Sequence, residues 1–504
     1  MFILARSALR RCPRWNARLL HHRDARLRNL STGSSQDPLK VVQNYSNPAS
    51  FVTEYFGRVF KYSLVGLLTL GVTLGTAFEA AHSYVENVAL AAETDPDARK
   101  WEWDLQGDRW SPRGSEGTDP ALGFRCRHAV RGAWMAQNWG TGSGGSVIGG
   151  PNNSNTPNIV DSSSQSAQDF LKIAISMAMT NRANGSNISE DTLRTLITRH
   201  ATLLESLGYK DSLFEARSEL ERVWKAFPPS GVEASQIAQR LGDLNRRLGD
   251  FDDAVVWWTR AVQLAGGKEP TTRIPLVVPT SSPSSPLAQR SLVTTLVSVS
   301  AFYATTGQLK KAREMETLSL DLIRSIKHPE SLHSSSPGEV LHALYILHRS
   351  AIISIHLAEV EHALRSSQET SFRWLASAAE SSERIAFALS EATQRASGRE
   401  IPLPIISRSP LIASYSGSVS MQRPASSLLV DSCRSAAEAW HLIGLLTEGS
   451  ESPSKAVEHY RRALGWIGVD AETLDEGVLP EVDQEWTPLL KNYIRVKTAS
   501  PKTT

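Results

Sequence analysis

Cysteine is scarce in this sequence, since only Cys12, Cys126 and Cys433 occur among 504 residues. Their spacing matches no zinc-binding or paired-thiol motif, which argues against a cysteine-based metal site. Cys126 and Cys433 are either bridged, as an oxidising compartment would allow, or two free thiols buried in the core. The sequence leaves both alternatives open.

The linear motifs of common enzyme classes are also missing. No GxxxxGK[ST], HExxH or GxSxG occurs, and no GxGxxG follows a strand-like segment. His342, His348, His356 and His362 lie in one predicted helix, but none of them forms the i, i+4 pair that helical zinc sites use. We therefore predict no catalytic, cofactor or metal residues, and a protein that is not an enzyme.

Acidic residues are nearly absent from residues 1–30, which contain eight Arg, one Asp and no Lys or Glu. Arg6, Arg10, Arg14 and Arg18 are four residues apart, so a helix would place them on one face. An Arg-rich, acid-poor, amphipathic start is typical of a mitochondrial transit peptide, and we predict one at 1–30. A basic arm that binds acidic surfaces is the alternative.

The remainder of the chain is mildly acidic. The formal net charge of +2 includes +7 from the first thirty residues, which leaves −5 for the rest. Charged residues make up 21% and hydrophobic residues 41% of the sequence, as in an ordinary folded soluble body. This balance argues against a multi-span transporter and against a broad basic face for nucleic acid.

Charge is absent from residues 62–78, which lie between Lys61 and Glu79. A helix of this length spans about 26 Å, near the short end for a bilayer core. We predict one transmembrane helix at 61–80. Basic residues precede the run and acidic residues follow it, which predicts a matrix-side segment at 31–60 and the C-terminal body in the intermembrane space. A buried core helix is the alternative.

Gly71 and Gly75 form a GxxxG step within this uncharged run. Small residues one helical turn apart allow a second membrane helix to approach closely. We interpret the two glycines as a candidate membrane-helix contact. The alternative is that they only reflect the general use of glycine in membrane helices.

Tryptophan is concentrated after the membrane run, in a predicted Trp-rich helical segment at 81–140. Five of the thirteen tryptophans of the chain lie there, namely Trp101, Trp103, Trp110, Trp134 and Trp139. Rings of this size either pack into a core or form a recognition surface, and both interpretations stay open. We predict a helix from about Gly123 to Asn138 and a flexible Gly- and Ser-rich loop at 141–166.

The body at 167–468 lacks the alternation of apolar and polar residues that strands require. Helical periodicity predominates, and Pro- and Ser-rich breaks fall at 269–286, 328–337 and 398–427. The predicted helices are 167–182, 189–207, 211–226, 233–248, 251–265, 288–306, 308–326, 338–364, 367–397, 428–448 and 453–466. We predict an all-α fold followed by a C-terminal tail at 469–504.

Residues 235–268 match the tetratricopeptide repeat pattern. The matching positions are Leu241, Gly242, Gly249, Phe251, Ala254, Trp258 and Ala261. Small residues at Gly242 and Ala254 let paired helices approach closely, and Gly249 relieves the turn between them. The two aromatic residues are expected to fill the gap to the neighbouring pair. Asn245 departs from the pattern, since an aromatic residue is usual there.

A second copy of the pattern lies at 437–468. Its matching positions are Trp440, Gly444, Ala456, Tyr460 and Ala463. Weaker copies span 293–326 and 189–226. Together they predict a tetratricopeptide-like helical repeat solenoid with one N-terminal transmembrane helix, and the inner face of such arrays binds peptides or proteins.

Alternate exposed positions of the first helix of each repeat line the binding groove in this repeat family. In this sequence the corresponding residues are Gln239, Asp243, Arg246, Glu438, His441 and Glu448. We predict these as candidate protein-binding residues, with plain solvated helix faces as the alternative.

A transit peptide, one membrane span and a tetratricopeptide body resemble a fungal family, the adaptor subunit of the mitochondrial inner-membrane i-AAA protease. The resemblance implies a non-catalytic quality-control adaptor that binds unfolded client proteins and passes them to the ATP-driven protease. It covers the architecture of most of the chain, but only 235–268 and 437–468 contain specific motifs. The chain also resembles the tetratricopeptide assembly factor of respiratory complex III. A membrane-anchored enzyme with an unrecognised site is a third alternative.

Overall fold

The chain is all-helical in the computed structural model. The described residues are 48–106, 110, 117–140, 162–267, 276–329, 331, 334–392, 403–449, 453–471 and 482–499. Apart from one isolated bridge between Ser390 and Leu411, these residues contain no β-structure. The predicted transit peptide at 1–30 and most of the predicted loop at 141–166 lie outside the described residues. The last residues of that loop already belong to a helix.

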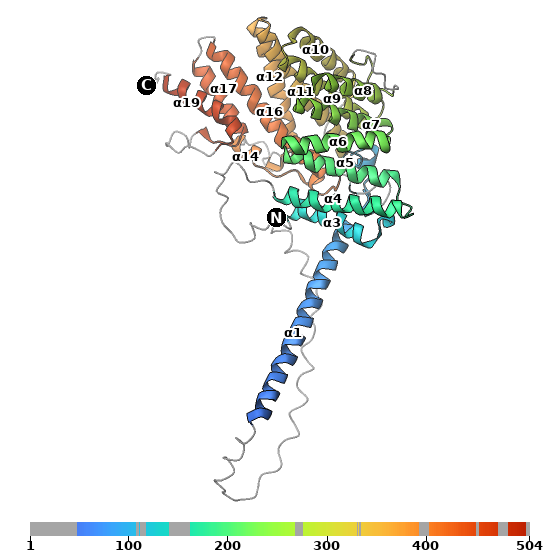
Figure 1. Cartoon of the computed structure of the whole chain (residues 1–504). Coiled ribbons are helices and arrows are strands. Elements are labelled where there is room, and N and C mark those ends of the chain that lie inside the picture. The colour runs from blue at the N-terminus through green and yellow to red at the C-terminus, as the bar shows by residue number, and fades with distance from the viewer. Residues whose placement is uncertain are drawn as a thin grey trace, which may run out of the picture. The chain divides into compact units, whose positions relative to one another are not determined.

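Helix α1 runs from Pro48 to Tyr84 and contains the whole predicted membrane segment (Figure 1). The chain divides into two compact units between Ala77 and Phe78, so the last residues of α1 belong to the second unit. The hydroxyls of Thr69 and Thr76 donate to carbonyls one turn earlier, at 2.7 and 2.8 Å. Such bonds satisfy a hydroxyl without water, as an apolar environment requires.

Two helical stretches in the described part of the chain are long and apolar enough to cross a membrane, Phe51–Ala89 and Pro337–Ala363. The most apolar window of the second is 61% buried within the fold, whereas that of the first is 0% buried. Because the second stretch is buried among other helices, its high hydropathy is that of a core helix. The first has no such cover, and the space beside Gly71 and Gly75 is open.

From Phe78 onward, consecutive helices pack against one another as pairs (Figure 1). The pairs are α3 (Gly123–Trp139) with α4 (Ser162–Ala183), α5 (Glu190–Leu207) with α6 (Lys210–Ala226), α7 (Gly231–Leu248) with α8 (Phe251–Ala265), α9 (Pro286–Thr305) with α10 (Leu309–Ser325), α11 (Pro337–Ala363) with α12 (Gln368–Leu389), and α16 (Gln422–Gly449) with α17 (Pro453–Trp466). First helices of neighbouring pairs also touch, α7 with α9, α9 with α11, and α11 with α16. They form a layer of first helices along the array.

The pair α7–α8 shows why the small residues of the repeat pattern are needed. A Cβ atom on Gly242 would lie 2.4 Å from the ring of Trp258, which is completely buried. The ring lies 5.5 Å from that of Phe302 in α9, so Trp258 fills the gap to the next pair as expected. Phe251 also reaches the next pair, with its ring 5.6 Å from that of Phe302, but lies at the edge of the contact and is 48% exposed. Gly249 has φ +93° and makes the turn between the two helices.

The pair α16–α17 repeats this contact. A Cβ atom on Gly444 would lie 2.4 Å from the ring of Tyr460, which is also completely buried. Glycine and aromatic residue are sixteen positions apart in both pairs. Ala456 and Ala463 are fully buried, like their counterparts in α8. Equal spacing in the sequence therefore produces the same contact between helices in both places.

Replacing Gly242 by alanine should lower the free energy of unfolding by about 1–3 kcal/mol, the usual cost of overpacking a core. Trp258 is unable to move away, because its Nε1 donates to Asp243 at 3.0 Å. Gly444→Ala should behave alike. In chemical denaturation, Gly449→Ala is the matched control, because the space around Gly449 is open. Equal stabilities for Gly242→Ala and Gly449→Ala would contradict the packing argument.

The C-terminal third departs from the predicted boundaries. Helix α12 ends at Leu389 and not at 397, because Ser390 becomes extended and pairs with Leu411. The predicted break at 398–427 contains two short helices, α14 (Leu403–Ser407) and α15 (Ala413–Ser416). Helix α16 begins within that break and has Pro424 in its first turn, where no amide hydrogen is needed.

Part of the predicted tail at 469–504 is a packed helix, α19 (Thr487–Ala499). Its apolar residues Leu489, Tyr493 and Val496 recur every three or four positions and are buried against α17. The short apolar face explains both why the helix packs and why the sequence pattern was too brief to reveal it.

Candidate protein-binding surface

Residues 93–106, here called the strap, run from the end of the α1 region across the layer of first helices. The strap includes one short helix, α2 (Pro96–Lys100), which begins after Asp95 as its N-cap. Everything else in the strap is non-helical. Its contacts reach positions in the chain that are hundreds of residues away.

Three strap carboxylates bind the N-terminal ends of three different helices. The side chain of Glu93 accepts from the amide of Ser420, just before α16, at 3.0 Å. Asp97 accepts from the Ser336 hydroxyl at 2.6 Å and from the amide of Gly338 at 2.5 Å, at the start of α11. Carboxylates are favourable there, because free amides and the helix dipole make a helix N-terminus positive.

The third carboxylate, Glu102, caps α9. It accepts from the Ser285 hydroxyl at 2.5 Å and from the amide of Leu287 at 2.8 Å. Glu102 has φ +55°, an uncommon backbone conformation for a residue other than glycine. The cap at the start of α9 is therefore made at a point where the strap turns sharply.

Arg290 of α9 binds the strap main chain from inside the fold. It is 1% exposed, and it donates to the carbonyls of Trp101 and Glu102 at 3.1 and 3.0 Å. Its guanidinium also lies 3.9 Å from the ring centroid of Trp103. Burial lowers the pKa of Arg290 to about 10, which still leaves it charged at neutral pH. A buried arginine thus binds two backbone carbonyls and one aromatic ring at the turn that follows α2.

The Trp-rich segment contains both core and surface rings. Trp103 is completely buried, and its Nε1 donates to the Gly338 carbonyl at 2.9 Å. Trp110 is 6% exposed and packs under the guanidinium of Arg199 at 4.6 Å. Trp139 is 40% exposed. The core interpretation therefore holds for Trp103 and Trp110, whose rings fix the strap and the residues after it to the first helices.

A cavity of about 1150 Å³ lies beside the strap. Its aromatic and charged lining includes Trp103, Trp110, Trp134, Tyr345, Arg99, Arg349, Arg423, Glu93, Asp104 and Asp431. The three arginines and three acidic residues balance in charge. Aromatic rings with charges of both signs favour a polypeptide ligand over a polyanion.

His348 and Arg349 of α11 face this cavity together with Asp431 of α16. Burial and the neighbouring Arg349 lower the pKa of His348 to about 3, so the imidazole is neutral. Burial raises the pKa of Asp431. His348 pairs with the Ser435 hydroxyl at 3.1 Å, which ties α11 to α16. His348 therefore serves packing between the two helices.

A smaller cavity of about 280 Å³ lies between α5 and α7, next to the last residues of the strap. Gln106 lines both cavities. The predicted groove residue Gln239 lines the smaller one, and its amide donates to Asp243 at 3.1 Å. Asp243 also accepts from Trp258, and burial raises its pKa. Arg246 is exposed. Of these three predicted groove residues, Gln239 lines a cavity. The Asp243 carboxylate instead accepts hydrogen bonds from side chains of the same helix pair.

The second predicted trio lies under the C-terminal helix α19. His441 pairs with Asn492 at 3.2 Å, and the two oxygens of Glu448 bind Arg495 at 2.5 and 2.9 Å. Glu438 stays exposed. Helix α19 therefore occupies His441 and Glu448.

His342 and both described cysteines are buried in the fold. Burial and Arg290 lower the pKa of His342 to about 3. Cys126 and Cys433 are free and buried, and burial raises their pKa to about 11 and about 12. Neither thiol is therefore ionised at neutral pH. The described residues contain no group of three potential ligands that would hold a metal ion.

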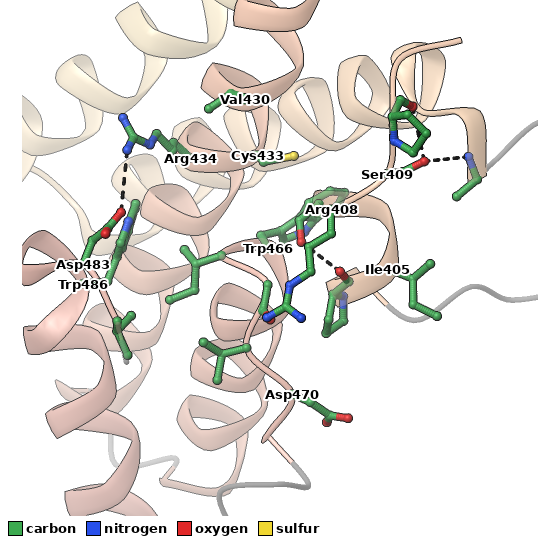
Figure 2. A pocket seen from close by; sticks show the side chains of 18 of the residues that line it. Ile405, Arg408, Ser409, Val430, Cys433, Arg434, Trp466, Asp470, Asp483 and Trp486 are labelled. Atoms are coloured by element: carbon green, nitrogen blue, oxygen red, sulfur yellow. Dashed lines mark hydrogen bonds and ion pairs between the residues drawn. The ribbon is translucent and has the colours of Figure 1, made fainter. Parts of the chain in front are cut away.

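A third cavity, of about 1100 Å³, lies at the C-terminal end between α14, α16, α17 and the residues that follow α12 (Figure 2). Trp466 and Trp486 contribute aromatic surface, and Ile405 and Val430 are more than half exposed. Figure 2 shows Arg434 reaching Asp483 at one side. This cavity is largely apolar and is separate from the one beside the strap.

Sequence reasoning missed Arg290 and the strap carboxylates. One signal for Arg290 was present, because it is the single charge in the apolar stretch 286–305. The carboxylates had no comparable signal, because their partners lie far away in the sequence. Comparison with protein-family models finds no match, and a search of curated proteins finds none either.

Proposed function

We propose that this chain is a non-catalytic scaffold that binds segments of other proteins, anchored by α1 in the mitochondrial inner membrane with its body in the intermembrane space. The exposed, uncharged run at 62–78 supports the anchor. Basic residues before the run and acidic residues after it support the orientation. The Arg-rich start of the chain supports the compartment.

The body, in this proposal, is a tetratricopeptide-like solenoid. The glycine–aromatic contacts of Gly242 with Trp258 and of Gly444 with Tyr460 support this assignment, because they occur at equal spacing in two helix pairs. The contacts between successive first helices are those of stacked repeats. Solenoids of this kind bind ligands along the layer of first helices.

The mode of strap binding is the observation that carries the proposal. The first helices hold the strap, which consists of one short helix and turns, by two backbone carbonyls, through Arg290, and by its carboxylates, at helix N-termini. Contacts to backbone carbonyls do not depend on the ligand sequence. A face that binds in this way suits clients that present free backbone carbonyls, and the cavity beside the strap offers room for one.

The partner assignment rests on the family resemblance. In this proposal the scaffold presents unfolded clients to an i-AAA protease, which supplies the ATP-driven chemistry. Assembly or quality control of a respiratory complex of the complex III type is the alternative, with the same topology and another client.

A photo-crosslinking amino acid at position 419 should capture client proteins in isolated mitochondria. Val419 lines the cavity beside the strap and is 63% exposed. Val277 is the matched control, since it is 61% exposed but lines none of the three cavities. Adducts that form equally at both positions, or at neither, would contradict binding in this cavity.

Affinity purification of the full chain after mild detergent extraction tests the partner. Recovery of an AAA protease together with crosslinked clients supports the adaptor proposal. Recovery of complex III subunits without a protease would refute the protease assignment and favour the assembly factor.

A further inference from the structure

We propose that the outer face of α3 and α4 rests on the lipid bilayer surface, so that the body contacts the membrane by a second element besides α1. This face, here called the α3–α4 face, consists of Phe124, His128, Gly132, Phe170, Ile173 and Met177. The inference rests on the proposed membrane crossing by α1 and adds to it a defined surface contact.

Three apolar side chains of the α3–α4 face are exposed. Phe124 is 69% exposed, Ile173 52% and Phe170 40%. Phe170, Ile173 and Met177 follow one another at intervals of three and four residues, so they share one side of α4. The ring of Phe170 lies over Gly132 of α3, 3.6 Å from where a Cβ atom would be, which joins the two helices into one surface. Adjacent exposed rings and aliphatic chains of this kind mark an interaction site.

The end of α1 is continuous with this face. Phe78 and His82, in the second compact unit, pack on α3, with ring centroids of Phe78 and His128 6.0 Å apart and those of His82 and His128 4.4 Å apart. Phe124 lies 4.0 Å from His128 on the same side. Since Phe78 is the last residue of the uncharged run, a bilayer crossed by that run reaches the edge of the α3–α4 face. Chain connectivity therefore brings a bilayer crossed by that run close to His128 and Phe124.

A tyrosine and a tryptophan lie together where α1 and α3 end. Tyr84 is the last residue of α1 and is 50% exposed, and its ring lies 6.0 Å from that of Trp139 at the end of α3. These two residue types concentrate at membrane–water interfaces, because they combine an apolar ring with a polar group. A lipid surface thus fits the face better than a protein partner does, since exposed apolar side chains and a neighbouring Tyr–Trp pair are the residue types that bilayer surfaces favour.

The test uses the full-length chain with a Cys12→Ser background, because Cys126 and Cys433 are buried. Single cysteines Ile173→Cys, Leu318→Cys and Leu70→Cys are labelled with a fluorophore and reconstituted into phosphatidylcholine–cardiolipin vesicles with or without brominated acyl chains. Leu318 is the matched control. It lies in the middle of α10, is 44% exposed, and is far from α3 and α4 in Figure 1.

We expect bromine to quench the label at 173 at least twofold more than the label at 318, and the label at 70 most strongly. Quenching at 173 equal to that at 318, with strong quenching at 70, would overturn the surface contact while leaving the membrane crossing intact. Weak quenching at 70 would overturn the crossing and the surface contact together. Unchanged circular dichroism of each labelled variant shows that the fold is kept.

Discussion

Replacing Glu383 by alanine should lower the free energy of unfolding by about 3–5 kcal/mol, the range for removing one partner of a buried ionic group. Glu383 of α12 is 7% exposed. It accepts from Trp440 Nε1 at 2.7 Å, from Trp466 Nε1 at 2.9 Å, and from Nε and Nη2 of Arg462 at 2.8 and 2.7 Å. One carboxylate thus joins α12 to both helices of the next pair.

The loss should be large because the donors have no substitute. Trp466 is 1% exposed, so its indole would stay buried without an acceptor. Arg462 is 46% exposed at its side chain and would find water, which moderates the effect. Glu383→Gln should lower the free energy of unfolding by an intermediate amount. Its amide oxygen still accepts a hydrogen bond, whereas its amide nitrogen faces other donors.

Glu380→Ala is the control for this experiment. Glu380 lies one turn away on α12, and its ion pair with Arg384 has side chains that are 75% and 60% exposed. An exposed pair of this kind contributes about 0.5 kcal/mol or less. Urea denaturation of the three variants gives the comparison, and an equal effect of Glu380→Ala and Glu383→Ala would refute the role of Glu383.

Stability should fall as the pH rises from about 4.5 to 8, and Glu316 should be a main cause. Glu316 of α10 is completely buried, and neither of its carboxyl oxygens has a hydrogen-bond partner. Burial, together with the charges of Glu359 and Glu361, raises its pKa to about 8 from the usual 4.5. The folded state therefore keeps a proton that the unfolded state has lost, and unfolding releases it in this pH range.

Glu316→Gln should remove this dependence and stabilise the fold by about 3 kcal/mol at pH 8, since each pKa unit corresponds to about 1.4 kcal/mol and some relaxation reduces the total. Below pH 4.5 the variant and the original chain should be equally stable. Glu314→Gln, at an exposed position of the same helix, is the control. Thermal or urea unfolding at several pH values measures both, and parallel curves for the original chain and Glu316→Gln would contradict the assignment.

The helices were largely predictable, because each carries its own pattern. Apolar residues at helical spacing predict α5 to α11 to within a few residues, and Gly249 predicts the turn between α7 and α8. The uncharged helical run at 62–78 was predictable for the same reason, since its composition is local. Local patterns failed where an apolar face was short, as in α14, α15 and α19, where proline stood inside a first turn, as in α16, and where a distant pairing ended a helix, as at Ser390 after α12.

The candidate surface was predictable only in part. Periodicity identifies the exposed side of a helix, but not what covers it. Asp243 was expected in a groove and is held by Trp258, while His441 and Glu448 were expected there and are held by α19. The strap depends on pairs such as Asp97 with Gly338, which are separated by 241 positions. No pattern within one segment reports such a pair.

The three strap carboxylates also determine how the body responds to tension. A pull on the chain before residue 93 reaches Glu93, Asp97 and Glu102, and through them the starts of α16, α11 and α9. These contacts lie at successive points along the strap, so the pull loads Glu93 first and reaches Asp97 and Glu102 only as the earlier contact gives way. The strap therefore has to be released from three helix starts in turn before tension passes beyond residue 102.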